Sequence, residues 1–136
     1  IYHKEIRYCS NRKEVKDHGD TGILLGSPIS DQDKVIIIED VTTAGTSIGE
    51  TMPILKAQGN VEVLGLVVSV DRMERGRTDK SALSEIEETY GINTTSIVTM
   101  EEVVEHLYNR PYHGEIIIDD RLKSEIDSYY EQYGVK

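Results

Sequence analysis

Two adjacent acidic residues, Glu39 and Asp40, follow an unbroken β-branched run and precede a polar turn. The run, Val35 to Ile38, has the composition of a strand that is buried on both faces, as in a parallel sheet. Such a strand delivers both carboxylates to its carboxyl end, where parallel sheets bind their ligands. Two neighbouring carboxylates can accept hydrogen bonds from two vicinal hydroxyl groups, such as the 2′ and 3′ hydroxyls of a ribose.

The residues after the acidic pair supply the donors that a phosphate group requires. Gly45 lets the main chain approach a ligand closely. Three hydroxyl side chains can add donors: Thr43, Thr46 and Ser47. A helix is expected to begin here, and its first amides and its dipole favour a bound anion. The segment therefore predicts a ribose 5-phosphate site, and the alternative is a capped helix after a buried strand with an acidic end.

The polar stretch from residue 10 to residue 22 could also do chemistry, because it is rich in basic side chains. It has no apolar period and ends in two glycines, so a long loop is expected, and long loops are often functional. The chain carries a formal net charge of −10, yet its first 16 residues hold an excess of Lys and Arg. This island of positive charge indicates a specific small anion as the ligand. The alternative is a solvated basic turn.

Strands alternate with helices along the chain, and this order positions both segments. Expected strands cover residues 5–9, 23–26, 35–38, 61–70 and 94–98. Expected helices cover residues 47–58, 81–90, 99–108 and 120–133, and the third opens with the capping-box spacing of Thr99 and Glu102. The alternation predicts an α/β fold with a mostly parallel twisted sheet flanked by helices, as a single domain over residues 1–136.

Composition excludes several classes of protein. The chain of 136 residues has the length of one domain, and no apolar run reaches the roughly 20 residues that a bilayer span requires. The pI of about 4.8 argues against binding to nucleic acid, which requires a basic surface. Cys9 is the single cysteine, so no intrachain disulfide can form, and no signal peptide is visible. We therefore expect a cytoplasmic protein that binds neither membranes nor nucleic acid.

The segment 35–47 resembles the signature with which type I phosphoribosyltransferases bind phosphoribosyl pyrophosphate (PRPP). That signature joins an apolar run, two acidic residues and a T-x-G-T/S loop. Residues 11–19 are very similar to the mobile catalytic loop of the members that act on orotate, and residues 71–76 look like their D-R-x-E-R-G segment. The resemblance implies the fold of that family and the transfer of a phosphoribosyl group from PRPP to orotate. Orotidine 5′-phosphate and pyrophosphate are the implied products, in pyrimidine synthesis.

The resemblance also implies roles for the signature residues. Glu39 and Asp40 would hold the ribose hydroxyls of PRPP, which also chelate magnesium, and with Lys16 they are the implied catalytic residues. Most magnesium ligands in the family come from PRPP itself, so Mg²⁺ is the implied cofactor without a direct protein ligand. The implied 5′-phosphate cradle consists of Thr42, Thr43, Ala44, Gly45, Thr46 and Ser47.

The basic loop and the segment 71–76 would bind the other reacting groups. The loop residues implied to close over the pyrophosphate are Arg12, Lys13, Lys16 and His18. In the family this loop serves the active site of the neighbouring subunit, so a homodimer is implied. Arg72 would bind the carboxylate or a ring oxygen of orotate, because a guanidinium matches planar acceptors. The alternative for Arg72 is a surface side chain paired with Glu74.

The sequence leaves two other functions open: a purine phosphoribosyltransferase and a PRPP-sensing regulator without catalysis. The segment 71–76 contains no aromatic residue that could stack on a purine. Regulators of this fold often lose a carboxylate or the loop lysine, whereas Glu39, Asp40 and Lys16 are all present. Both observations favour the enzyme that acts on orotate.

Two further expectations concern the ends of the chain. The family's intact chain carries a hood segment and a pyrophosphate-binding loop on the amino-terminal side, and neither precedes Ile1. We therefore expect an N-terminally incomplete core that is inactive or severely impaired by itself. The tyrosines of the last helix are expected to pack the helix rather than to form a binding platform: Tyr129, Tyr130 and Tyr133.

Overall fold

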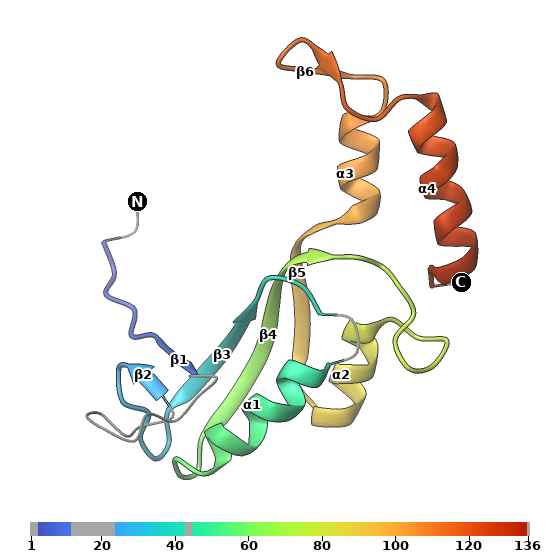
Figure 1. Ribbon diagram of the computed structural model, residues 1–136. Coiled ribbons are helices and arrows are strands. Elements are labelled where there is room, and N and C mark those ends of the chain that lie inside the picture. The colour runs from blue at the N-terminus through green and yellow to red at the C-terminus, as the bar shows by residue number, and fades with distance from the viewer. Residues whose placement is uncertain (1–2, 12–23, 43–44, 136) are drawn as a thin grey trace, which may run out of the picture.

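A parallel three-stranded sheet forms the centre of the protein (Figure 1). The computed structural model describes residues 3–11, 24–42 and 45–135. The strands lie in the order β3-β4-β5 and comprise β3 (Lys34–Glu39), β4 (Glu62–Asp71) and β5 (Asn93–Thr99). The register aligns Ile38 with Val67 and Val67 with Thr95, so the carboxyl ends of all three strands point the same way. The predicted α/β class with a parallel sheet is confirmed.

Two helices cover one face of this sheet. Each connects successive strands, α1 (Thr46–Lys56) between β3 and β4, and α2 (Ala82–Tyr90) between β4 and β5. Parallel crossovers are almost always right-handed, so two crossovers that advance in the same direction place both helices on the same face. The core between the helices and the sheet consists of Ile37, Ile48, Met52, Leu55, Leu66, Val68, Leu83, Ile86 and Ile92.

The opposite face of the sheet is open among the described residues. Ile36 is 55% exposed and Ile38 is 77% exposed, whereas Ile37 between them is 7% exposed. On β5, Ile97 is 76% exposed. Successive side chains of a strand point to opposite faces, and the described crossover helices cover a single face. The expectation that residues 35–38 are buried on both faces is therefore wrong for the described part of the chain.

Local signals set the end of α2 and the start of α3 as the sequence predicted, whereas α1 ends at Lys56, before the expected stop at Gly59. The side chain of Ser81 caps α2 by accepting a main-chain hydrogen bond, and Gly91 ends α2 in the left-handed conformation. Thr99 and Glu102 form the predicted capping box at the start of α3 (Met100–Leu107). These ends agree with the sequence because a cap depends on residues only three or four positions apart.

A short antiparallel pair of strands, β1 (Cys9–Asn11) and β2 (Leu24–Gly26), lies to one side of the central sheet (Figure 1). The strand predicted over residues 5–9 is wrong except at Cys9, which pairs with Gly26. So short a strand forms only where it finds a partner, and a partner distant in sequence leaves no local signal. The strand predicted over residues 23–26 is confirmed from Leu24 onward, and most of the predicted 10–22 loop lies outside the described residues.

The helix α3 and the last helix, α4 (Asp120–Tyr133), form an arm beyond the carboxyl edge of the sheet (Figure 1). At its tip is a hairpin of β6 (Pro111–Tyr112) and β7 (Glu115–Ile116), which the sequence analysis missed because two-residue strands have no periodicity to detect. Asp120 joins the two helices by accepting hydrogen bonds of 2.8 Å from the side chains of Tyr108 and Asn109. Within the described ranges, no helix has the length and apolar character that crossing a bilayer requires.

Candidate functional site

A pocket of about 520 Å³ lies where the carboxyl ends of the three parallel strands meet α4. Its lining comes from the strand ends, from the loop after β4 and from α4: Val41, Val70, Met100, Arg72, Glu74, Glu125, Ile126, Tyr129 and Tyr130. Most of these side chains are apolar or aromatic, and a few charged groups stand among them. This composition and volume suit a small organic ligand. The position is the one expected of ligand sites in parallel sheets.

The acidic pair stands beside this pocket, at the end of β3. Glu39 is the last residue of β3, and the main chain after it stays attached to β4. The carbonyl oxygen of Asp40 accepts hydrogen bonds from the amides of Ser69 at 3.0 Å and Val70 at 3.1 Å. The Asp40 carboxylate also accepts a 2.7 Å hydrogen bond from the amide of Val41, which lines the pocket. Pairing with β4 thus holds both carboxylates at the carboxyl edge, as predicted from the strand pattern.

The start of α1 differs from the starts of the other three helices. Gly45 precedes α1 with φ 65° and ψ 17°, and no side-chain cap or acidic residue of the first turn is present at this end. A side chain caps each of the other helices, Ser81 on α2, Thr99 on α3 and Asp119 on α4. The hydroxyl of Thr42 accepts from the Gly45 amide at 3.3 Å. The first amides and the positive dipole end of α1 therefore lack a compensating side chain among the described residues.

Packing against α2 is a second reason why position 45 requires glycine, and the sequence did not reveal it. A Cβ atom at this position would lie 3.1 Å from Cγ1 of Ile86 on α2. The absence of a side chain therefore lets α1 begin close to α2. Two further members of the predicted cradle, Thr43 and Ala44, lie outside the described residues.

Arg72 follows β4 and faces a neighbouring carboxylate. Its Nη2 atom lies 2.5 Å from Oε1 of Glu74, which is the ion pair that the surface alternative required. The same carboxylate oxygen accepts a 2.8 Å hydrogen bond from the hydroxyl of Tyr129 on α4. Arg72 and Glu74 both line the pocket, so this pairing takes place inside the candidate site.

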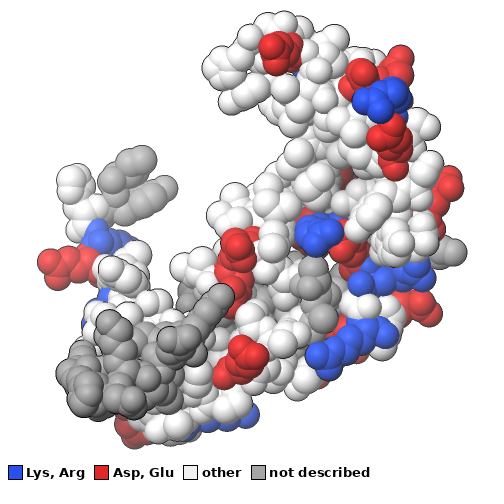
Figure 2. All heavy atoms as spheres, viewed as in Figure 1, with Lys and Arg blue, Asp and Glu red and all other residues white. Residues whose placement is uncertain are grey.

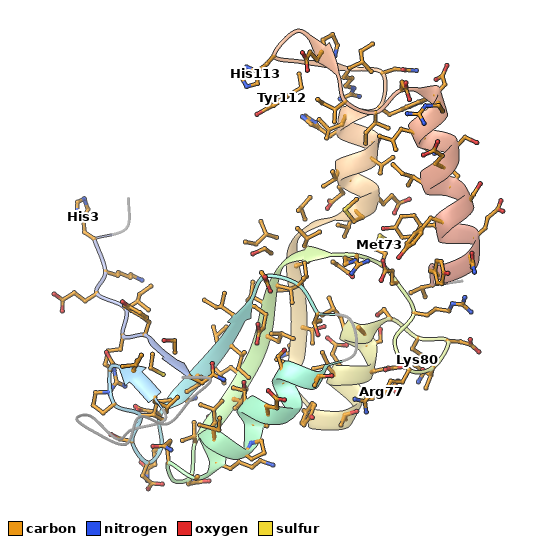
Figure 3. All side chains as sticks on the ribbon, in the orientation of Figure 1. His3, Met73, Arg77, Lys80, Tyr112 and His113 are labelled. Atoms are coloured by element: carbon orange, nitrogen blue, oxygen red, sulfur yellow. The ribbon has the colours of Figure 1, made fainter. Side chains whose placement is uncertain are left out.

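The end of α4 holds the loop that carries Arg72. The main chain of Met73 has φ 54°, which is uncommon for a residue other than glycine. Two hydrogen bonds stabilise this turn, one from the Met73 amide to Asp71 at 2.8 Å and one from the Val135 amide to the Met73 carbonyl at 3.1 Å. Figure 3 shows Met73 at the point where the loop meets the last turn of α4. The amide of Arg75 also donates to the carbonyl of Tyr133 at 2.9 Å.

Tyr129 and Tyr130 are site residues that the sequence analysis missed. Both line the pocket, and the Tyr130 hydroxyl donates a 2.7 Å hydrogen bond to the carbonyl of Arg72. They also pack the helix as expected, because the rings of Tyr129 and Tyr133 have centroids 4.8 Å apart. The repeated tyrosines on an amphipathic helix were a visible signal, but they did not reveal which segment α4 would contact.

The same contacts change the acidity of both tyrosines. The hydrogen bond to the Glu74 carboxylate raises the pKa of Tyr129, because a phenolate could not donate it. Burial raises the pKa of Tyr130, and the charge of Glu74 acts in the same direction. Both hydroxyl groups are therefore protonated donors at neutral pH.

Figure 2 shows basic and acidic side chains interspersed over this part of the surface rather than a continuous basic patch.

The predicted pyrophosphate-binding residues lie outside the described residues: Arg12, Lys13, Lys16 and His18. Their position relative to the pocket stays a prediction. Within the described ranges, no group of three or more His, Cys, Asp and Glu side chains is arranged to hold a metal ion.

Comparison with known proteins identifies the family of this chain. Residues 3–97 match the family described as phosphoribosyl transferase domain. The chain is 79% identical over 135 residues to the orotate phosphoribosyltransferase of Lachnoclostridium phytofermentans, a match that covers 99% of this chain and 60% of that protein. It is 66% identical to the orotate phosphoribosyltransferase of Clostridium beijerinckii, covering 97% of this chain and 59% of that protein.

A solved structure resembles the fold over almost the whole chain. The crystal structure of orotate phosphoribosyltransferase from Francisella tularensis superposes with a TM-score of 0.73 and 28% sequence identity. The match covers 98% of this chain and 58% of that one. The chain thus spans about 60% of the length of the curated relatives that it matches.

Proposed function

The chain belongs to the phosphoribosyl transferase domain family, and from this membership we propose that the protein transfers the phosphoribosyl group of PRPP to orotate. The products are orotidine 5′-phosphate and pyrophosphate. The names of its relatives support orotate as the acceptor. The protein acts in the cytoplasm as a homodimer, and the similarity of residues 11–19 to a loop shared between subunits supports the dimer.

The junction of β3 with α1 is the observation that carries the proposal. The carboxylates of Glu39 and Asp40 lie at the carboxyl edge of the sheet, and the uncapped start of α1 follows them along the chain. A ribose 5-phosphate requires these two features, hydroxyl acceptors and amide donors with a positive dipole end. The pocket that contains Arg72 opens at the same edge, where an acceptor base would have to lie.

In the proposed reaction the bond between ribose C1′ and the pyrophosphate oxygen breaks, and a ring nitrogen of orotate bonds to C1′. The electron pair of the broken bond leaves with pyrophosphate, so the ribose passes through an oxocarbenium-like state. Glu39 and Asp40 accept hydrogen bonds from the ribose hydroxyls and hold the sugar in the reactive orientation. Lys16 and its basic neighbours stabilise the negative charge that develops on pyrophosphate. Closure of their loop excludes water, which would otherwise capture the sugar cation.

The donor set of the candidate site fits a magnesium ion that is bound mainly by the substrate. Glu39 and Asp40 are the carboxylates of the junction, and one or two carboxylates together with substrate phosphates are a common ligand set for Mg²⁺. Mg²⁺ prefers octahedral oxygen coordination and keeps several waters, so PRPP oxygens and water would complete its shell. When bound, the ion neutralises charge on the pyrophosphate group. The two carboxylates would orient the hydroxyls that contact it.

Arg72 is the proposed anchor for the acceptor base. Its guanidinium lines the pocket, and a planar fork of N–H donors matches a carboxylate or a ring carbonyl. The tyrosines Tyr129 and Tyr130 line the same pocket, so aromatic side chains are present beside Arg72 although the segment 71–76 contains none. Purine bases therefore belong in the test as competing acceptors.

The test uses the protein expressed from its complete reading frame. Calorimetric titration with PRPP and Mg²⁺ should show binding, and addition of orotate should yield orotidine 5′-phosphate with release of pyrophosphate. Asp40→Asn should weaken PRPP binding by at least about tenfold, because hydrogen bonds to charged groups contribute roughly 1.5–3 kcal/mol. Glu62→Gln is the matched control, because it also removes one negative charge. Glu62 begins β4 at the amino edge of the sheet, whereas Asp40 lies at the carboxyl edge.

Three outcomes would contradict parts of the proposal. Unchanged PRPP affinity in Asp40→Asn would refute the assignment of the diol acceptor. Turnover of hypoxanthine or guanine but not of orotate would identify a purine phosphoribosyltransferase. Tight PRPP binding with no product from either class of base would favour the regulator.

A further inference from the structure

We propose that Tyr129 and Glu74 are positioning residues that hold the Arg72 guanidinium toward the acceptor base, so that α4 sets the affinity for that base. The inference rests on the proposed function, in which Arg72 binds the acceptor. It adds that a residue outside the loop of Arg72, Tyr129 on α4, helps to set the orientation of Arg72. The contacts of one carboxylate oxygen, Oε1 of Glu74, support this inference.

The side chains of Arg72, Glu74 and Tyr129 form a cluster around Oε1 of Glu74. This oxygen accepts hydrogen bonds from Nη2 of Arg72 at 2.5 Å and from the hydroxyl of Tyr129 at 2.8 Å. Nη2 of Arg72 also lies 3.4 Å from the Tyr129 oxygen, so each of the three groups contacts the other two. The Glu74 side chain is 16% exposed and that of Arg72 is 40% exposed. The carboxylate is thus largely enclosed, while the guanidinium is accessible from the solvent side.

This geometry leaves donors of Arg72 for a ligand. A guanidinium has five N–H donors, and the contacts with Glu74 and Tyr129 use those of one terminal nitrogen. Neither Nε nor Nη1 of Arg72 donates to another described residue. The cluster therefore fixes Nη2 of the Arg72 guanidinium and leaves Nε and Nη1 available to donate to a planar acceptor.

A second contact from α4 fixes the main chain of Arg72. The hydroxyl of the adjacent Tyr130 donates to the Arg72 carbonyl at 2.7 Å. Consecutive tyrosines of one helix thus hold the side chain and the main chain of the same arginine. Both line the pocket with Arg72, so the contacts lie at the wall of the candidate site and not at a remote surface.

Holding the arginine in advance should improve binding of the base. A long side chain that is free to rotate loses this freedom when a ligand orders it, whereas a side chain that is already held loses less. Tyr129→Phe removes one hydroxyl and keeps the ring. We expect it to raise the KM for orotate about tenfold, with the KM for PRPP and kcat changed less than about twofold.

The experiment measures steady-state kinetics of the protein from its complete reading frame, with urea unfolding to verify that each variant folds. Tyr133→Phe is the matched control, because it removes a hydroxyl from the same helix that donates to no described residue. Arg72→Ala reports whether the arginine binds the base. Glu74→Gln keeps an oxygen acceptor and should retain most of the orotate affinity, whereas Glu74→Ala should lose it as Tyr129→Phe does.

The outcomes separate this inference from the function on which it rests. A large rise in the orotate KM for Arg72→Ala and Tyr129→Phe, with a normal value for Tyr133→Phe, supports both. A rise for Arg72→Ala alone overturns the positioning role and leaves the proposed function intact. An unchanged orotate KM for Arg72→Ala overturns the role of Arg72 and the inference with it. Should Tyr129→Phe fail to fold, equal orotate KM values for Glu74→Ala and wild type would overturn the positioning role.

Discussion

Replacing Gly45 with alanine would disturb the start of α1 in two measurable ways. Gly45 has φ 65° and ψ 17°, a left-handed conformation that costs a residue with a Cβ atom roughly 1–2 kcal/mol. The new Cβ would also lie 3.1 Å from Cγ1 and 3.4 Å from Cδ1 of Ile86, so the Ile86 side chain or the start of α1 must give way by a few tenths of an ångström. Such overpacking costs about 1 kcal/mol or more. The free energy of unfolding should therefore fall by about 2–3 kcal/mol.

Gly91→Ala is the matched control for this prediction. Gly91 ends α2 with φ 65° and ψ 31°, and a Cβ there would have no neighbour within 4 Å. Its substitution should therefore cost only the backbone contribution of about 1–2 kcal/mol. The excess loss in Gly45→Ala, on the order of 1 kcal/mol, measures the contact with Ile86. Urea unfolding of the two variants gives both values from the same midpoint analysis.

The same pair of variants tests the phosphate cradle. A shift at the start of α1 should misplace its first amides and weaken PRPP binding by about tenfold, because hydrogen bonds to charged groups are strong. Gly91→Ala should bind PRPP normally, since Gly91 precedes β5 at the amino edge of the parallel sheet and the junction lies at the carboxyl edge. Equal unfolding free energies for Gly45→Ala and Gly91→Ala would refute the packing argument. Normal PRPP affinity in a folded Gly45→Ala protein would refute the cradle.

Further predictions concern the basic loop, the dimer and the arm. Lys16→Ala should lower kcat much more than PRPP affinity, and an equal loss in both would mean that the lysine binds only the ground state. Lys16→Ala and Asp40→Asn subunits, assayed at limiting PRPP where each has little activity, should regain about a quarter of wild-type activity when mixed, because half the dimers are mixed and carry one intact site. No recovery on mixing would show that each loop serves its own subunit. The hydrogen bond from Tyr108 lowers the pKa of Asp120 below its ordinary 3.8 and raises that of Tyr108 above 10.0. The stability that this bond adds should be lost as pH falls through the lowered pKa of Asp120 or rises through the raised pKa of Tyr108. In thermal melting curves, Tyr108→Phe should reduce the loss of stability at low pH and the loss at high pH. An unchanged loss of stability at alkaline pH would contradict the role assigned to Tyr108.

Local features of the fold could be predicted because neighbouring residues encode them. The β-branched run before Glu39 forms β3 with the acidic pair at its carboxyl end, and Thr99 with Glu102 forms a capping box. Gly91 ends α2 in the conformation that glycine adopts most readily. Each of these features depends on side chains within a few positions of one another, so chain order alone specifies them.

Features that depend on distant partners could not be predicted in this way. The run from 35 to 38 indicated a strand, but only the packing of α1 and α2 decided that Ile37 is buried while Ile38 is exposed. The contact of Arg72 with Tyr129 joins residues that are 57 positions apart. No local pattern specifies it, because it requires that α4 return from the arm to the carboxyl edge of the sheet. The sequence by itself therefore determined the acidic pair, the polar turn and the elements that carry them, whereas the tertiary structure decided which side chains surround the pocket.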